Sequence, residues 1–186
     1  MSGKADTTEA LLLDLIRLTR AEFDMRCAAA LTWDLEGHDD SIDARAFGLF
    51  TGLAVSYARP FVPGKRNPYG ELKKPWSQFP GRADFAEHHR LLIDARNTLL
   101  AHNDLTPHRT PLVLLKWLGD KPAVTEQRTA IQAAGIPITR ELCTFQQTRF
   151  STRAREIAEE LQKSLGWTGA EVNVDDELAR VRQLSR

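Results

Sequence analysis

The sequence has few cysteines, no surplus of either charge and no long hydrophobic run. Among its 186 residues, 25 Lys and Arg balance 25 Asp and Glu, so the formal net charge is +0. Bulk basicity therefore cannot hold a nucleic acid, and any such binding needs a local patch. No apolar run approaches the roughly 18 residues of a membrane span, and Asp14 and Arg17 interrupt the apolar N-terminal stretch. We therefore expect a cytoplasmic protein without a membrane partner.

The two cysteines, Cys27 and Cys143, lie far apart in helix-like surroundings. Two buried, reduced thiols are the simplest interpretation of such a pair in the cytoplasm. A disulfide or a catalytic thiol is the alternative.

The overall composition is that of a globular domain, with 42% hydrophobic and 27% charged residues. Charge is nevertheless uneven along the chain. Residues 1–45 carry 5 basic and 10 acidic side chains, whereas residues 59–90 carry 7 basic and 3 acidic ones. An acidic face and a basic face on one body would explain this, and charge scattered over a solvated surface is the alternative.

Apolar residues recur at helical spacing in four long segments. The first segment is preceded by a capping-box pattern, Asp6 with Glu9, and the last by Thr139 as a candidate cap. Gly166 stands where a left-handed helix end belongs. The predicted helices cover about residues 8–35, 41–57, 84–102 and 139–165.

These helices predict an all-α protein, most economically an antiparallel up-and-down bundle of four main helices. Gly48 and Gly52 lie one turn apart in the second helix, which favours close helix packing there. Residues 111–118 favour a strand, which with 123–132 would form a small β-hairpin insertion near 112–132. We expect the bundle domain to span residues 1–166 and residues 167–186 to form a peripheral C-terminal tail.

A long loop is expected over residues 60–81, where five of the nine prolines and three glycines fall. It interleaves basic with aromatic side chains, a combination that suits single-stranded nucleic acid. A packed or mobile connector is the alternative. The basic residues are Lys65, Arg66, Lys73 and Lys74, and the aromatic ones are Tyr69, Trp76 and Phe79.

The end of the third helix gathers Arg96, Asn97, His102 and Asp104. Arg is a permanent cation whose planar fork matches phosphate oxygens. His titrates near neutrality and can move a proton to or from a ribose hydroxyl. Together these groups are sufficient for RNA cleavage without a metal, and Asn97 could orient the 2′-hydroxyl or the phosphate.

A purely structural interpretation fits the same residues. Arg96 could pair with an acidic residue of the first helix, and His102 could cap the carbonyls that end the third. The spacing alone carries no weight, because Arg82 and His88 repeat it. What distinguishes Arg96 is its context, since Asn97 follows at once and a helical apolar stretch leads to His102.

In that context residues 91–104 resemble the HEPN superfamily, and the helix order extends the resemblance over about residues 8–165. Many members are metal-independent endoribonucleases of toxin–antitoxin, abortive-infection and other phage-defence systems. The resemblance implies that Arg96, Asn97 and His102 are catalytic, that the substrate is RNA, and that an antitoxin or defence-system protein is a partner. In some members a nucleotidyltransferase antitoxin modifies a Tyr two residues after the His; here Asp104 stands there, which argues against such an antitoxin.

The end of the second helix, from Tyr57 to Phe61, is also similar to a recurring feature of bacterial HEPN proteins. We therefore include it in a wider set of weaker candidates for RNA binding. This set comprises Tyr57, Arg59, Lys65, Arg66, Lys73, Lys74 and Asp104.

The spacing of Arg96 and His102 bears on the oligomeric state. Six residues of α-helix correspond to about 9 Å of rise and about 240° of rotation. One isolated helix therefore presents the two side chains poorly to a single phosphate. Pairing two copies of the third helix across a two-fold axis would bring two such sets into one cleft, and HEPN ribonucleases typically use a composite site of this kind. We expect a homodimer through this helix.

Other candidates for chemistry are weaker. His88 and His89 with Asp84 lack a second ligand cluster, so we expect neither a metal nor a cofactor. No nucleophile motif or Gly-rich phosphate loop is present. The tryptophans Trp33, Trp117 and Trp167 are expected in the core or at its rim. The alternatives to a ribonuclease are an inactive module of the same fold that binds RNA, a nucleotide or a protein, and a structural subunit of a defence complex.

Overall fold

The structure is a computed structural model that describes residues 2–36, 44–63, 69–101, 113–118, 121–126, 135–167 and 171–184. Helices dominate it, which confirms the prediction of an all-α body. The helices are α1 (Ser2–Glu36), α2 (Ala44–Ala58), α3 (Ala83–Ala101), α4 (Ile136–Leu165) and α5 (Val174–Leu184), with a 3₁₀ turn, η1 (Lys74–Ser77). Two strands, β1 (Val113–Leu118) and β2 (Lys121–Glu126), lie between α3 and α4 in the chain.

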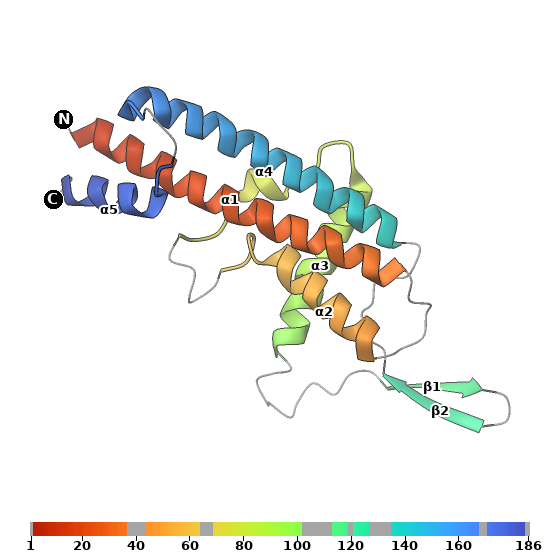
Figure 1. Cartoon of the computed structure of the whole chain (residues 1–186). Helices are drawn as coiled ribbons and strands as arrows, with labels where there is room; N and C mark the ends of the chain where they lie inside the picture. The colour runs from red at the N-terminus through yellow and green to blue at the C-terminus, as the bar shows by residue number, and fades with distance from the viewer. Residues whose placement is uncertain are drawn as a thin grey trace.

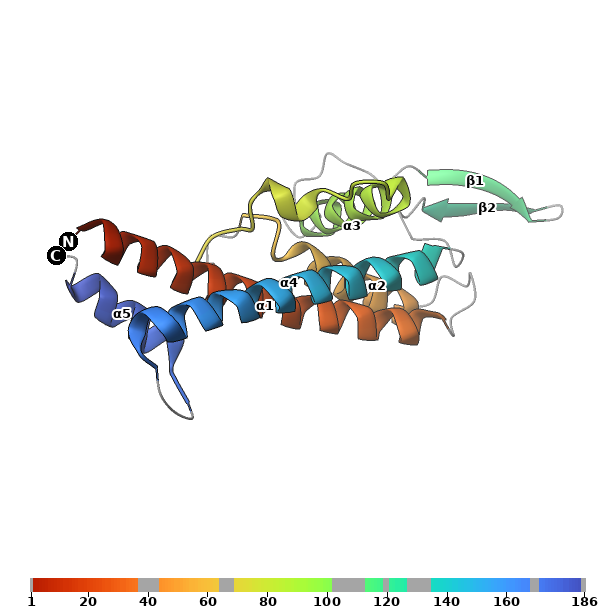
Figure 2. The same ribbon diagram turned by 90° about the horizontal axis from the view of Figure 1, so that it is seen from above.

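The two longest helices form the spine of the molecule. α1 and α4 pack side by side and run in opposite directions (Figures 1 and 2). α2 and α5 pack on α1, and α3 packs on α2 and α4. The buried apolar residues of α1 and α4 recur at the spacing that predicted these helices, because that spacing places them on the faces the two helices share. Those buried to within 2% exposure include Leu12, Met25, Leu142, Phe150, Ile157 and Leu161.

Two of the predicted N-terminal helix caps are wrong, because both helices begin earlier than expected. α1 already begins at Ser2, so Asp6 lies inside the helix and does not cap it. α4 begins at Ile136, and Thr139 instead donates its hydroxyl to the carbonyl of Gly135 at 3.0 Å. The predicted cap at Gly166 is confirmed: its φ is 66°, a left-handed conformation that glycine adopts without strain.

The two glycines of α2 have different surroundings. A Cβ added at Gly52 would lie 3.3 Å from Leu31 Cδ1, so α2 approaches α1 closely at this residue. Gly48 is exposed, and a Cβ built there would meet no other described residue within 4 Å beyond its chain neighbours and its own helix backbone. The predicted close packing therefore holds for Gly52 and is wrong for Gly48.

The described part of the proline-rich segment is packed against the helices. The amide of Leu72 donates to the carbonyl of Pro60 at 2.8 Å, and Phe79 is 8% exposed. Tyr69 and Trp76 are partly buried against the core. Residues 69–81 are therefore packed against the helices while Lys73 and Lys74 stay exposed; Lys65 and Arg66 lie outside the described residues.

The strands β1 and β2 pair antiparallel, with Val113 opposite Glu126 and Leu118 opposite Lys121. The second strand thus begins before residue 123, where the predicted partner segment starts. In both views the pair extends away from the helices (Figures 1 and 2). The side chain of Trp117 lies outside the described residues.

The C-terminal segment, predicted as a peripheral tail, instead adds to the core. Its helix α5 packs on α1 and buries Leu178 and Val181 to 3% and 6% exposure. At its end Arg182 Nε lies 2.7 Å from Glu9 Oε1 of α1. The sequence signal is weak because α5 is a short helix with a mostly polar surface. Among the described residues, no helix has the length and apolar character needed to cross a membrane.

Candidate functional site

The C-terminal half of α3 carries the first two residues of the predicted catalytic set. Leu92 and Ala95 are buried and hold this part of the helix against the core. Arg96 is partly exposed and Asn97 is exposed. An Nη1–H of Arg96 donates to Asn97 Oδ1 at 3.0 Å, so the guanidinium is held by its chain neighbour at the surface.

The third residue of the set, His102, lies outside the described residues, as does Asp104. The structure therefore places Arg96 beside Asn97 and does not test how either is placed relative to the imidazole. The side chains that follow, from Thr98 to Ala101, are outside the description as well.

The alternative role proposed for Arg96 is not seen. In the part of the chain that the structure describes, no hydrogen bond or ion pair joins Arg96 to an acidic residue of α1. Among its described side chains, the first helix therefore supplies no carboxylate partner to Arg96.

Tyr57 does not form an RNA-binding surface, contrary to the prediction. Its side chain is fully buried, and its hydroxyl lies 2.9 Å from His89 Nδ1. The ring of His89 also lies edge-on to that of Phe61, with centroids 4.9 Å apart. Tyr57 is thus a core residue that joins α2 to α3.

Arg59 is an exposed side chain with a structural partner. Its Nη1 lies 2.5 Å from Asp24 Oδ1, and the Asp24 side chain is only 7% exposed. Burial raises the pKa of the Asp24 carboxyl, and the charge of Arg59 opposes this rise. Arg59 therefore compensates this buried acid in the monomer, while 60% of its side chain remains exposed.

Lys73 and Lys74 are exposed at the start of η1, as an RNA-binding role requires. They adjoin Trp76, whose carbonyl accepts a hydrogen bond from Gln146 Nε2 at 2.7 Å. Gln146 is fully buried and in turn accepts from Arg149 Nη1 at 3.1 Å. Neither Gln146 nor Arg149 is among the predicted residues. A polar residue on the apolar stripe of α4 could nevertheless have been noticed in the sequence.

The two neighbouring histidines do not converge on a common ligand. His88 Nδ1 lies 2.8 Å from the hydroxyl of Thr139, whereas His89 faces Tyr57. Asp84 pairs with Arg82 at 2.8 Å. Among the described residues, no three His, Cys, Asp or Glu side chains come together as a possible metal site.

The cysteines have no disulfide partner, and neither is placed as a nucleophile. Cys143 is buried in the core and Cys27 is partly buried; both are free. Burial raises the pKa of the Cys143 thiol to about 12, so this side chain is a thiol at neutral pH. Trp33 is 64% exposed, so the prediction that it lies in the core or at its rim is wrong; its ring is covered on one face by the Arg140 guanidinium, 3.4 Å from the ring centroid.

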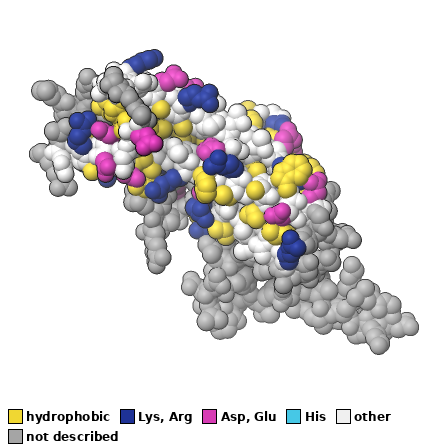
Figure 3. Space-filling view, in the orientation of Figure 1, with side chains coloured by type: hydrophobic (Ala, Val, Ile, Leu, Met, Phe, Trp, Pro, Cys, Tyr) yellow, Lys and Arg dark blue, Asp and Glu magenta, His cyan; other side chains and the backbone are white. Residues whose placement is uncertain are grey.

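The expected separation of acidic and basic faces is not visible on the face shown in Figure 3. Basic and acidic side chains are interspersed there over the described helices. Several charged side chains form ion pairs with one another, such as Arg140 with Glu36 at 2.6 Å. The face shown in Figure 3 therefore offers no uniformly basic surface to a polyanion.

No known protein family, curated protein or solved structure matches the chain. The case for a function therefore rests on the residues and their geometry.

Proposed function

We propose that the protein is a metal-independent endoribonuclease with its site at the C-terminal end of α3. The observation that carries the proposal is the state of Arg96. Its guanidinium lies at the surface, donates to Asn97 Oδ1 at 3.0 Å and has no carboxylate partner among the described residues. A positioned cation of this kind, six residues before His102, suits a reacting phosphate.

The proposed reaction is attack by the ribose 2′-hydroxyl on the adjacent phosphorus. His102 takes the proton from the hydroxyl, and the 2′-oxygen forms a bond to phosphorus. The bond from phosphorus to the 5′-oxygen breaks, and that oxygen leaves with a proton from the imidazolium of His102 or of its counterpart in a second copy. The products are a 2′,3′-cyclic phosphate and a 5′-hydroxyl end. Arg96 stabilises the charge that builds on the phosphoryl oxygens.

The proposal includes a homodimer in which two copies of α3 meet. The six-residue spacing of Arg96 and His102 in the sequence supports it. Six residues of ideal α-helix turn through about 240°, and a second copy can supply the group that one copy would present poorly. The architecture we propose for each copy is an antiparallel up-and-down bundle of α1 to α4, with β1 and β2 as an insertion. The biological role we propose is that of a cytoplasmic toxin or phage-defence effector, restrained by a partner protein.

The test is RNA cleavage without metal. Purified protein is incubated with end-labelled single-stranded RNA in EDTA, and the products are examined for cyclic phosphate ends. We expect cleavage by the parent protein and its loss in Arg96→Ala and His102→Ala. Arg90→Ala is the matched control, because Arg90 is an exposed residue of the same helix, paired with Asp94 at 3.7 Å.

Cleavage that persists in both Arg96→Ala and His102→Ala would overturn the assignment. RNA binding by the parent without any cleavage would instead identify an inactive binding module of the same fold.

A further inference from the structure

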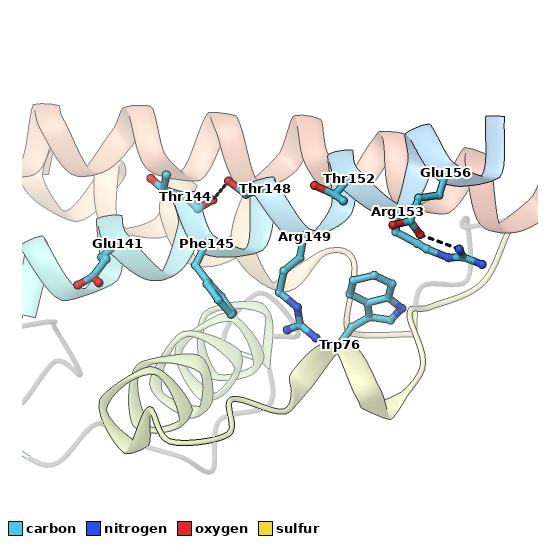
Figure 4. A pocket seen from close by; sticks show the side chains of 9 residues that line it. All are labelled: Trp76, Glu141, Thr144, Phe145, Thr148, Arg149, Thr152, Arg153 and Glu156. Carbon is cyan, nitrogen blue, oxygen red and sulfur yellow. Dashed lines mark hydrogen bonds and ion pairs between the residues drawn. The ribbon is translucent and has the colours of Figure 1, made fainter. Parts of the chain in front are cut away.

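A hollow of about 640 Å³ lies between η1 and α4, away from the predicted site. Its apolar walls are Trp76 of η1 and Phe145 of α4, and Arg149 lies between them. Figure 4 shows Phe145 and Arg149 pointing from α4 toward α3 and η1, with the Trp76 ring beside the guanidinium. The hollow therefore combines aromatic surface with a cation.

Arg149 is held in place by uncharged acceptors. Its Nη1 donates to Gln146 Oε1 at 3.1 Å and to the Gln78 carbonyl at 3.4 Å, and its Nη2 donates to the Pro75 carbonyl at 3.2 Å. The guanidinium also lies 5.1 Å from the Trp76 ring centroid and 5.4 Å from that of Phe145. These three bonds use three of its five N–H donors.

The charges around the hollow leave Arg149 without a carboxylate. The two acids on its rim are engaged by other residues, since Glu141 pairs with Arg82 at 2.9 Å and Glu156 with Arg153 at 2.8 Å. Among the described residues, none of the hydrogen bonds or ion pairs of Arg149 goes to an acid. A fixed cation without a counter-charge is suited to an anionic ligand.

Two further features indicate which anion fits. The Phe145 side chain is 40% exposed at the hollow, so part of its ring is available for stacking. Lys73 and Lys74 are exposed three and two residues before Trp76 in the chain and add positive charge beyond the hollow. Aromatic rings combined with cations along a groove are the arrangement that binds unpaired nucleotides, because bases stack while phosphates are neutralised.

We propose that this hollow binds unpaired nucleotides of a single-stranded RNA. A base stacks on Phe145, and the adjoining phosphates lie at Arg149 and at Lys73 and Lys74. The inference rests on the proposed ribonuclease function, to which it adds a substrate-binding subsite distant from the scissile linkage.

The position of α3 relates this subsite to the proposed catalytic end. α3 begins beside the hollow, where Arg82 pairs with Glu141 and the Phe85 ring lies 5.4 Å from that of Phe145. Arg96 lies 14 residues beyond Arg82 in the chain, which is about 20 Å along a helix axis. An RNA strand must therefore extend over several nucleotides to occupy both places. Longer unpaired substrates should bind more tightly than trinucleotides.

The experiment measures RNA binding separately from cleavage. The full chain carrying Arg96→Ala is titrated with fluorescein-labelled oligouridylate of ten nucleotides, and binding is followed by fluorescence anisotropy at several salt concentrations. Into this background we introduce the double variant Lys73→Gln, Lys74→Gln, the single variant Arg149→Gln, and Phe145→Ala. Arg155→Gln is the matched control, since Arg155 is an exposed α4 residue that does not line the hollow.

We expect the slope of log K against log salt to fall by about 0.7 in Arg149→Gln and by about 1.4 in the double lysine variant. Phe145→Ala should weaken binding at least about fivefold through lost stacking, and Arg155→Gln should leave binding unchanged. Thermal unfolding of each variant identifies any loss of folding. If Arg149→Gln or Phe145→Ala disrupts the packing of η1, the variant of the exposed lysines Lys73 and Lys74 still tests the proposal.

The proposal is overturned if folded Arg149→Gln and Phe145→Ala bind like their background, if the lysine variant does so, or if the parent binds no oligouridylate. Failure of the subsite and failure of the proposed ribonuclease function give different results in these experiments. Binding that depends on the hollow but comes without cleavage by the wild-type chain would support the subsite and remove the nuclease. If the wild-type chain cleaves RNA and the lysine variant binds RNA normally, the nuclease is supported and the subsite is refuted.

Discussion

The hydroxyl of Tyr57 and Nδ1 of His89 lie 2.9 Å apart and join α2 to α3 inside a cluster of aromatic rings. Burial lowers the pKa of His89 to about 4, so its ring is neutral at pH 7. In the tautomer protonated at Nε2, the ring accepts the hydrogen bond from Tyr57. The pair satisfies two polar groups that would otherwise weaken the core.

This pair predicts a loss of stability in mild acid. An unfolded His titrates near 6.5, so between pH 6.5 and pH 4 the unfolded chain binds a proton that the folded chain does not. The free energy of unfolding should therefore fall as the pH decreases through this range. Allowing for the partial exposure of His89, we expect this one group to contribute about 2 kcal/mol of the fall.

Urea denaturation of the parent and of His89→Asn at pH 7 and pH 4.5 tests this prediction. The variant replaces the imidazole by an amide that can still accept from Tyr57, and its stability should depend less on pH. All other ionisable groups are present in both proteins and cancel in the comparison. Equal pH dependence in the two proteins would contradict the prediction.

The helices can be predicted from the sequence, whereas the contact between Tyr57 and His89 cannot. The helices are predictable because apolar residues such as Leu12, Leu142 and Ile157 recur at a local period that any helix imposes. The contact between Tyr57 and His89 depends on how α2 and α3 meet, which no local period specifies. For the same reason, the sequence pattern misassigns Tyr57 to a binding surface and gives no role to Gln146.

Arg96 and Asn97 are identifiable in the sequence by their residue types, and the structure adds their contact at 3.0 Å. That contact is between chain neighbours, so it requires no knowledge of the fold. The hollow beside η1 cannot be predicted in the same way. It brings together Trp76 and Phe145, which are far apart in the chain and meet only because residues 69–82 fold back across α4.

Arg59 should matter for stability through Asp24. In Arg59→Met the buried carboxylate loses the cation 2.5 Å away, and its pKa should rise further. Because Arg59 is largely exposed and Arg20 also lowers the pKa of Asp24, we expect a loss of about 2 kcal/mol at pH 7, less than for a fully buried pair.

The pH dependence of that loss has a definite sign. A carboxyl whose pKa is raised on folding binds a proton more readily in the folded state, so acidification toward 3.8 relieves the cost of burying its charge. The penalty of Arg59→Met should therefore shrink between pH 7 and pH 4.5 in urea denaturation. Arg180→Met, which breaks an exposed pair with Glu177 at 2.8 Å, should cost at most about 0.5 kcal/mol at either pH. A penalty that grows in acid would contradict this account.

Cleavage should depend on the planar, multi-donor geometry of the Arg96 guanidinium as well as on its positive charge. Arg96→Lys keeps the positive charge but has one nitrogen, which cannot bond Asn97 and span two phosphoryl oxygens with the same geometry. We expect the cleavage rate to fall more than about tenfold, with little change in melting temperature because the side chain is partly exposed. Arg90→Lys on the same helix is the control, and cleavage by Arg96→Lys at the parent rate would show that charge alone suffices.

The two glycines of α2 provide a test of how closely α2 packs on α1. Gly48 is exposed and has open space where an alanine methyl would lie, so Gly48→Ala should stabilise the protein by about 0.5–1 kcal/mol through helix propensity. At Gly52 the same methyl meets Leu31 Cδ1 at 3.3 Å, and the cost of moving Leu31 should cancel the gain or reverse it. Chemical denaturation of both variants gives the difference directly. In the Leu31→Ala background the obstacle is gone, so Gly52→Ala should then stabilise about as much as Gly48→Ala does. If Gly52→Ala is equally stabilising in the wild-type chain, α2 and α1 are not in the close contact that the structure gives them.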